Sequence, residues 1–316
     1  MQVVRSHPSA PPRVQSGIAL VLVLWMLALL SVIAGSLVFS WRTELLMARN
    51  LTSLAQAEAL ADAGVHKAIH ELAQSQTDPQ RWKGDGLTRL WIFQGAKLRV
   101  TILDESAKVN INAAPAVLLK GLFRAVGVAE ADADALADAV ADWRDADDLR
   151  NLHGAEKADY AAAGKDYGPA NALFETTEEL RQVLGMNDDL FHKLESLVTV
   201  YSRQSGINTA VARREVLLAL PGTTPEQVDI FLGQRQTLLE QGLPAPVFPG
   251  IQPLSSGATG SVFSIQVEVV LSDNVRFFRE AVVRLTGNIK EPVMVLAWRA
   301  PAENFGSMAT APGVVN

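Results

Sequence analysis

The sequence contains no cysteine, which excludes disulfides, thiolate zinc sites and cysteine nucleophiles. It also has no P-loop, no nucleophile elbow and no glycine-rich dinucleotide turn. These absences remove the common classes of enzyme, and we expect a protein that is not an enzyme. With 316 residues, the chain is long enough for two domains and a sizeable core.

Charge is missing from one long stretch near the start of the chain, which ends at Arg42. The 24-residue, predominantly apolar run Ile18–Trp41 would span about 36 Å as a helix, enough to cross a bilayer. This run is longer than the core of a cleaved secretory signal. Residues 1–17 are proline-rich and charged only at Arg5 and Arg13, so we expect this leader in the cytoplasm and the remainder outside.

The helix is expected to continue past the membrane. Between Arg42 and Gln74 the apolar residues recur at helical spacing, and there is no proline before Pro79. One helix of about 60 residues therefore begins in lipid and ends as an amphipathic stem beneath a globular head. Alternating, β-branched segments predict an antiparallel sheet for that head, at 90–106, 261–273, 276–287 and 292–299.

This combination resembles the type IV pilins and their secretion-system relatives, the pseudopilins. In that family a prepilin peptidase cuts after a glycine, and the resemblance implies a cut between Gly17 and Ile18. Most members then carry a glutamate at the fifth mature position, where this chain has Leu22. The glutamate pairs with the terminal amine of the subunit above, because a lone carboxylate in lipid is costly. A subunit that lacks this glutamate cannot form that ion pair with a subunit above, which favours a position at the tip of the filament.

The chain is similar in particular to the K component of type II secretion, a minor pseudopilin that also lacks this glutamate. The segment Ala59–Ile69 looks like the helix end of that family. The resemblance implies an α+β fold, in which a long N-terminal helix packs on an antiparallel sheet that carries a large inserted, mostly α-helical domain. The expected divisions are a leader (1–17), membrane helix and stem (18–75), first part of the head (76–105), inserted domain (106–245), second part of the sheet (246–300) and flexible tail (301–316).

The expected insert is acidic, with 22 acidic and 13 basic residues between Glu105 and Glu240. Leu220-Pro221-Gly222 resembles a helix-hairpin-helix turn, which can bind DNA phosphates through backbone N–H groups. Acidic surroundings oppose that binding, so a purely structural turn is the favoured interpretation.

The insert also contains a degenerate internal repeat. Val109–Leu122 and Gly206–Gly222 share Ile-Asn-x-Ala followed by Val-Leu-Leu, with Asn112 and Asn208 as predicted N-caps. Two further helix starts are predicted from capping boxes, one at Thr176 and one at Thr224.

The densest group of carboxylates follows Trp143. It comprises Asp142, Asp145, Asp147, Asp148 and Glu156, with Asp159 and Asp166 as reserves. Hard oxygen ligands at short spacing suit Ca²⁺, although the pattern is not an EF-hand. On spacing alone, a solvated acidic helix end is equally good. Calcium is known in the helical domain of the K family, so the resemblance implies a calcium site with these ligands.

The leading hypothesis is a minor pseudopilin at the tip of a short periplasmic filament, anchored in the bacterial inner membrane by a single helix before assembly. The implied partners are the I and J minor pseudopilins, the prepilin peptidase and the inner-membrane secretion platform, with no nucleic acid. One alternative is the tip subunit of a type IV or DNA-uptake pilus whose insert contacts DNA. Another is a periplasmic adaptor that stays anchored and is never processed.

Overall fold

The computed structural model describes residues 16–74, 81–241, 243–249, 254–256, 259–272, 275–288 and 290–300. Its first element, helix α1, runs from Ser16 to Ala73. In the described part of the chain, this is the one helix long and apolar enough to cross a membrane. The chain forms two compact units that divide between Gln56 and Ala57, within this helix.

The second unit contains a five-stranded sheet with every neighbouring pair antiparallel, in the order β1-β2-β7-β8-β9. Its strands are β1 (Asp85–Phe93), β2 (Ala96–Asp104), β7 (Val262–Val270), β8 (Arg276–Leu285) and β9 (Val293–Arg299). β1 and β2 form a hairpin whose turn residues, Gln94 and Gly95, both have positive φ, as a tight two-residue turn requires. The turn expected at Asp273 and Asn274 lies outside the described residues.

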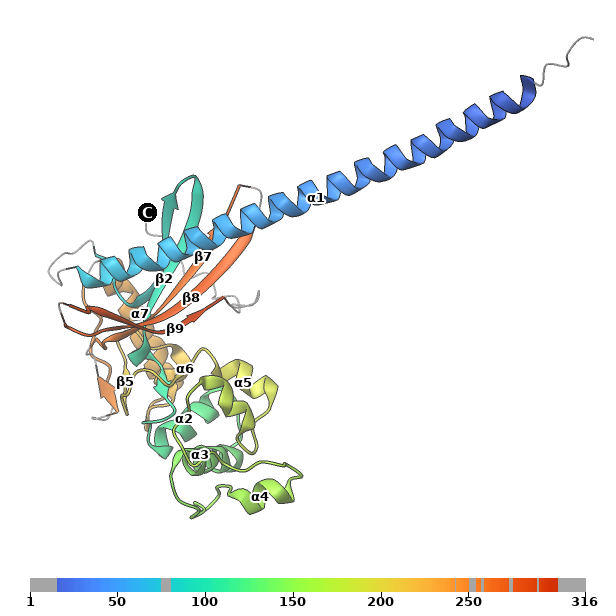
Figure 1. Cartoon of the computed structure of the whole chain (residues 1–316). Helices are drawn as coiled ribbons and strands as arrows, with labels where there is room; N and C mark the ends of the chain where they lie inside the picture. Colours follow the sequence, from blue (N-terminus) through green and yellow to red (C-terminus); the bar gives the residue numbers. More distant parts are fainter. Residues whose placement is uncertain are drawn as a thin grey trace, which may run out of the picture. The chain divides into compact units, whose positions relative to one another are not determined.

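The final turns of α1 pack on one face of this sheet (Figure 1). Small residues of the helix, such as Ala57, Ala61 and Ala68, meet β-branched residues of the central strands. At Gly64 the approach is so close that a Cβ atom would lie 2.7 Å from Val267 Cγ1. The amphipathic stem predicted from the sequence is therefore the core partner of the sheet, with apolar side chains burying each other.

Between β2 and β7 the chain builds a helical region with its own hydrophobic core. Its elements are η1 (Glu105–Ala107), β3 (Val109–Asn110), α2 (Ala116–Ala125), α3 (Glu130–Arg144), α4 (Lys157–Ala162), η2 (Thr177–Gln182), α5 (Asp188–Leu194), β4 (Val198–Thr199), β5 (Ile207–Asn208), α6 (Arg214–Leu218), α7 (Pro225–Glu240) and β6 (Ser255–Ser256). The predicted α+β class, with a helical insert interrupting an antiparallel sheet, is confirmed.

Two helical hairpins, α2–α3 and α6–α7, repeat the same local structure inside the insert. Each follows one strand of a short parallel pair: α2–α3 follows β3, which pairs with β4, and α6–α7 follows β5, which pairs with β6. Asn110 Oδ1 accepts from the backbone N–H two residues later (2.9 Å), and Asn208 Oδ1 does the same (3.1 Å). The structural counterpart of Asn208 is therefore Asn110, because the Asn-x-Ala identity read from the sequence is out of register with the backbone.

The predicted N-caps at Asn112 and Asn208 are wrong. Helix α2 begins after Pro115 and α6 after Arg213. Asn112 instead exchanges two hydrogen bonds with the backbone of Phe174, 2.9 Å from Nδ2 and 2.8 Å to Oδ1. A side-chain amide can hydrogen-bond to the backbone of a distant segment as well as to a local helix start. Here Asn112 bonds to the distant segment.

The capping boxes at Thr176 and Thr224 are both present. In the second one, Gln227 N donates to Thr224 Oγ1 (3.3 Å) and Thr224 N donates to Gln227 Oε1 (3.1 Å). These bonds satisfy backbone N–H groups directly after the Leu220-Pro221-Gly222 turn. Two N–H groups beside the turn, those of Thr224 and Gln227, are thus engaged within the chain, which favours a structural turn.

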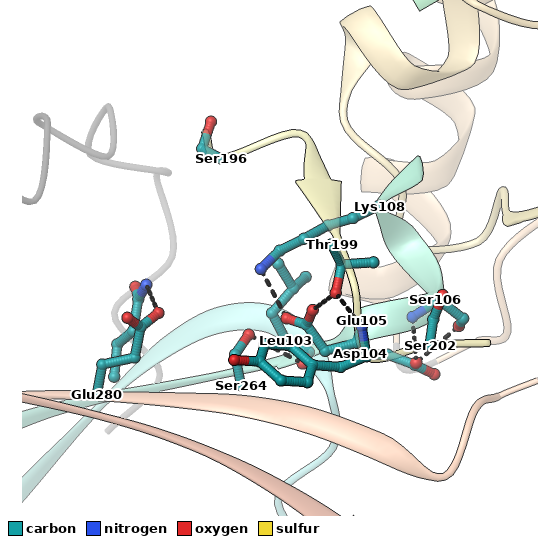
Figure 2. Close-up of polar contacts among 12 residues, drawn as sticks. Leu103, Asp104, Glu105, Ser106, Lys108, Ser196, Thr199, Ser202, Ser264 and Glu280 are labelled. Atoms are coloured by element: carbon teal, nitrogen blue, oxygen red, sulfur yellow. Dashed lines mark hydrogen bonds and ion pairs between the residues drawn. The ribbon is translucent and has the colours of Figure 1, made fainter. Parts of the chain in front are cut away.

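A buried polar junction joins the insert to the sheet (Figure 2). At the end of β2, the Asp104 carboxylate accepts from Ser106 N (2.9 Å) and from Gly260 N (2.6 Å), just before β7. Burial raises the pKa of Asp104. The next residue, Glu105, binds Lys108 Nζ at 2.6 Å and accepts from the hydroxyl of Thr199 on β4. The two chain segments that connect the insert are therefore tied to one carboxylate.

Candidate functional site

The predicted processing site lies at the start of α1. Gly17 and Ile18 are in its first turn, and Ile18 and Leu22 are both exposed. There is no acidic residue in this first turn. Residues 1–15 of the leader and the tail 301–316 lie outside the described residues. The peptide bond that a prepilin peptidase would cut therefore stands at the N-terminal edge of the apolar helix.

The predicted acidic cluster gathers around the end of α3 and the loop that follows it. Asp142, in the last turn of α3, is fully buried. Its Oδ1 accepts from Asn151 N (3.1 Å) and Asn151 Nδ2 (2.5 Å), whereas its Oδ2 has no hydrogen-bond partner in the described structure. A buried carboxylate oxygen without a partner is costly, and a cation is one of the few groups that can satisfy it.

The loop approaches Asp142 through Gly154. A Cβ atom at this position would lie 1.9 Å from Asp142 Oδ2, so any other residue would displace the carboxylate or the loop. The glycine is required here by the close approach of backbone to carboxylate. A cradle of this kind leaves Oδ2 enclosed by backbone.

Glu156, the N-cap of α4, is only 7% exposed, and its carboxylate oxygens make no well-formed hydrogen bond beyond a loose capping-box contact with the first turn of α4. Burial and the charges of Asp142, Asp145 and Asp148 raise the pKa of Glu156. Burial and the charges of Asp147 and Asp142 likewise raise the pKa of Asp145, whose Oδ1 is also buried without a partner. These carboxylates are close enough to repel one another, which is the electrostatic condition that a divalent cation relieves.

The remaining acidic candidates divide into two groups. Asp147 Oδ1 accepts from Leu149 N (2.9 Å) and Asp148 Oδ1 from Asn171 Nδ2 (3.0 Å), which leaves each with a second oxygen beside the cluster. Asp159 is engaged by Arg150 (2.9 Å) and by Glu156 N (2.9 Å), and Asp166 is exposed. The two reserves are therefore poorer candidates than the five residues first predicted.

Sequence reasoning missed one oxygen donor, Asn171. Its Oδ1 is buried without a partner while its Nδ2 contacts Asp148, and its backbone has a positive φ of 49°. An asparagine in this backbone conformation is the one signal that the sequence could have offered, because asparagine tolerates it better than most residues. Its proximity to the carboxylates depends on the fold and has no periodic signature.

The oxygen atoms of the cluster can be compared with the ligands that Ca²⁺ prefers. Across the residues that the structure describes, no three His, Cys, Asp or Glu side chains stand together in metal-ligating geometry. The unpartnered buried oxygens nevertheless come from Asp142, Asp145, Glu156 and Asn171, which mix carboxylate and amide. Such an all-oxygen set suits Ca²⁺, whose geometry is flexible and accepts backbone carbonyls, and it suits zinc poorly. The chemistry of these oxygens, rather than an assembled set of ligands, is what agrees with calcium.

Aromatic side chains support the loop from beneath. Trp143 stacks on Phe174 with ring centroids 5.9 Å apart and lies 6.2 Å from the ring of Tyr160. The Tyr160 hydroxyl accepts from Leu184 N at 2.9 Å, and burial raises the pKa of Tyr160 to about 12. The carboxylates therefore rest on a rigid apolar base, which fixes their position.

Comparison with known proteins identifies the same region. A family model described as "Type II secretion system (T2SS), protein K" matches residues 96–203. This range begins in β2 and covers the acidic cluster.

Relatives extend the match beyond this range. A putative type II secretion system protein K of Escherichia coli K12 is 27% identical over 59% of this chain and 62% of its own length. The Pseudomonas aeruginosa protein K is 25% identical over 71% of this chain and 73% of its own. The protein K of Pectobacterium carotovorum is 26% identical over 86% of this chain and 93% of its own.

The fold is similar to a solved structure, the crystal structure of a GspK-GspI-GspJ complex from enterotoxigenic E. coli. The TM-score is 0.60, at 18% identity, over 81% of this chain and 99% of that chain. At this identity the likeness concerns the fold alone. The family match and the relatives lead to one conclusion: the chain is similar to the protein K family of type II secretion systems, and its fold agrees with that similarity.

Proposed function

We propose that the chain is a minor pseudopilin that caps and helps initiate the periplasmic pseudopilus of a type II secretion system. The observation that carries this proposal is α1 itself. Its first part is an exposed apolar helix suited to a bilayer, and its last turns are the core partner of the head's sheet. One continuous element thus links a membrane segment to a folded head, and its role is assembly rather than catalysis.

Processing gives this proposal its first test. The leader lies in the cytoplasm, the prepilin peptidase cuts between Gly17 and Ile18, and the head is periplasmic. Because the cut precedes the apolar segment, the helix stays in the mature protein. Mass spectrometry of the membrane-extracted protein should give an N-terminus at Ile18. An N-terminus at Met1 or Gln2 would show instead an unprocessed anchor.

The tip position rests on Leu22. An apolar residue at the fifth mature position needs no ion pair with the amine of a subunit above. The subunit's own terminal amine can still pair with the glutamate of a subunit below. Leu22→Glu should make the subunit behave like one from the middle of the filament. Secretion and tip-complex assembly should then fall, whereas Leu22→Ile should have no effect. Unchanged assembly in Leu22→Glu would remove the argument for the tip.

The partners are the I and J minor pseudopilins, whose relatives are bound to the K protein in the E. coli complex. The inner-membrane platform holds the chain before assembly. The insert, held by the junction at Asp104 and Glu105, widens the head. A further subunit would meet this bulk if it were added above, which is why the chain ends the filament.

Calcium is the second part of the proposal. Asp142, Asp145, Asp147, Asp148 and Glu156 would hold the ion, with Asn171 as an added oxygen donor. The ion neutralises buried carboxylates and stiffens the loop between α3 and α4. Binding that is restricted to the folded state stabilises it, by about 2.7 kcal/mol at a calcium concentration 100 times Kd.

Chelation tests this part. EGTA should lower the melting temperature of the purified chain, and added Ca²⁺ should restore it. The double variant Asp145→Ala/Asp147→Ala should lose that response, whereas Asp166→Ala is a matched control at an exposed carboxylate and should retain it. A melting curve indifferent to both chelator and double variant would favour a solvated acidic loop.

A further inference from the structure

The two edges of the sheet differ in how well the chain protects them. Strand β1 forms one edge and β9 the other. On β1, Arg89 forms an ion pair with Asp85 (2.7 Å) and its guanidinium lies 6.0 Å from the Trp82 ring. Charged, self-paired side chains of this kind discourage another strand from adding to an edge.

Strand β9 carries charge only at its last residue, Arg299, which forms an ion pair with Glu178 (3.0 Å). Its residues Val293–Trp298 include no charge and no proline, and no described strand pairs with its outer edge. Met294 and Val295 are about half exposed, on opposite faces of the sheet. One register shift, at Leu296, interrupts the strand and shortens the uninterrupted edge to a few residues on either side. The edge therefore presents unpaired backbone groups between apolar side chains.

The face of β9 that looks toward α1 is also incomplete. Val295 and Trp298 lie opposite Val283 and Ala281, which belong to the core beneath the helix. Yet Val295 is 51% exposed and Trp298 38% exposed. Trp298 is bordered by the ring of His66 (6.1 Å) and the guanidinium of Arg279 (5.5 Å). The sheet thus extends one strand beyond the part that the helix covers, which leaves an apolar shelf.

We propose that the outer edge of β9 receives a short extended segment of a neighbouring minor pseudopilin, which adds a sixth strand to the sheet. Open backbone N–H and C=O groups at a strand edge are matched by another extended backbone. The apolar shelf selects an uncharged segment whose alternate side chains cover Val295 and Trp298. This inference rests on the proposed function, because the occupant is a subunit of the same tip complex.

The test uses the full-length chain in detergent with its I and J components. In the isolated chain, amide hydrogen exchange at residues 293–299 should be fast. On binding, its rate should fall by at least about tenfold. Val295→Glu should weaken binding by about tenfold or more, because a charge on an edge opposes strand addition. Ile92→Glu is the matched control on β1, where 65% of the side chain is exposed, and should change binding less than about twofold.

Equal exchange at residues 293–299 with and without partners would overturn the β9 proposal while leaving the proposed function intact. So would equal affinities for the two glutamate variants. If the wild-type chain binds neither I nor J, both proposals fail. Protection that is present in the isolated chain and lost on deletion of residues 301–316 would assign the edge to the chain's own tail. Protection that rises with concentration of this chain alone would assign it to a second copy, and either result overturns the proposal.

Discussion

The two helical hairpins of the insert share a scaffold but not a site. In the first, Arg144 donates to Ile111 O and to Ala114 O (2.8 Å). In the second, Arg235 donates to Thr209 O (3.2 Å) and Ala212 O (2.8 Å). The accepting carbonyls lie at equivalent positions of the two repeats. Each hairpin is therefore held to its preceding loop by one half-buried arginine.

Beyond this arginine the hairpins differ. Arg144 ends α3 and the chain turns into the acidic loop, whereas α7 continues past Arg235 to Glu240. Two residues before each arginine stand Asp142 and Gly233, the first buried and the second exposed. The repeated residues thus maintain the fold, and the carboxylates are an addition to the first hairpin alone. Four predictions would break or sharpen this comparison.

The largest effect is expected where the hairpins touch. A Cβ atom at Gly121 on α2 would lie 2.1 Å from Ala219 O, a backbone atom that cannot move cheaply. Gly121→Val should cost about 3 kcal/mol or more of unfolding free energy, measured by urea denaturation with tryptophan fluorescence. Gly233→Ala on α7 meets open space and should be neutral or stabilise by up to about 1 kcal/mol. Similar costs for both would show that the hairpins are not tightly packed.

The arginines come next. Burial lowers the pKa of both Arg144 and Arg235, because each guanidinium loses hydration that its hydrogen bonds to carbonyls replace. Arg144→Met and Arg235→Met each leave two carbonyls short of a donor and should each destabilise the fold by about 2–4 kcal/mol. The same denaturation assay, in EGTA, should give values within about 1 kcal/mol of each other. A much smaller loss for Arg235→Met would mean that the two contacts are not equivalent.

The effect of Glu156→Gln on stability should change sign between calcium-free and calcium-containing buffer. In EGTA the substitution removes like-charge repulsion at a buried site and should raise the melting temperature. In Ca²⁺ it removes a ligand and should lower stability by about 1–3 kcal/mol relative to the wild-type chain. Differential scanning calorimetry in both buffers measures the two effects. A shift of the same sign in both would separate Glu156 from any ion.

The smallest effect concerns helix starts. The N-cap of α7 is Thr224, with a complete capping box, whereas the N-cap of α3 is Ala129, which has no side-chain hydrogen bond. Thr224→Ala should destabilise the second hairpin by about 1 kcal/mol, and Ala129→Ser should stabilise the first by about 0.5–1 kcal/mol. Thermal melting of each variant would check this, and equal signs would contradict it.

Much of the fold was predictable because it depends on local periodicity. The helical spacing after Arg42 predicts the stem, and alternation in the C-terminal segments predicts the sheet. Capping boxes at Thr176 and Thr224 were predictable for the same reason, since their bonds join residues three apart. The true register of the repeat was not, because Asn110 and Asn112 offer the same residue type two positions apart.

The candidate site was predictable only in part. The spacing of the carboxylates and the family resemblance nominated Asp142 and its neighbours, but neither could say which oxygens are buried without partners. The roles of Gly154 and Asn171 could not be predicted, because these residues come near the cluster only when the loop folds back on α3. The cleavage at Gly17 and the role of Leu22 stay predictions that chemistry on the intact protein must test.

The sequence alone therefore determined the membrane-length helix, its continuation as a stem, the acidic character of the insert and the family resemblance. Each of these is carried by residue type or short-range period, which survives without knowledge of what packs where. Tertiary structure decided the pairing of Arg144 and Arg235 with their loops, the isolation of the Asp142 and Glu156 oxygens, and the unprotected edge at β9. Burial and hydrogen bonding depend on neighbours distant in the chain, and only folding brings these together.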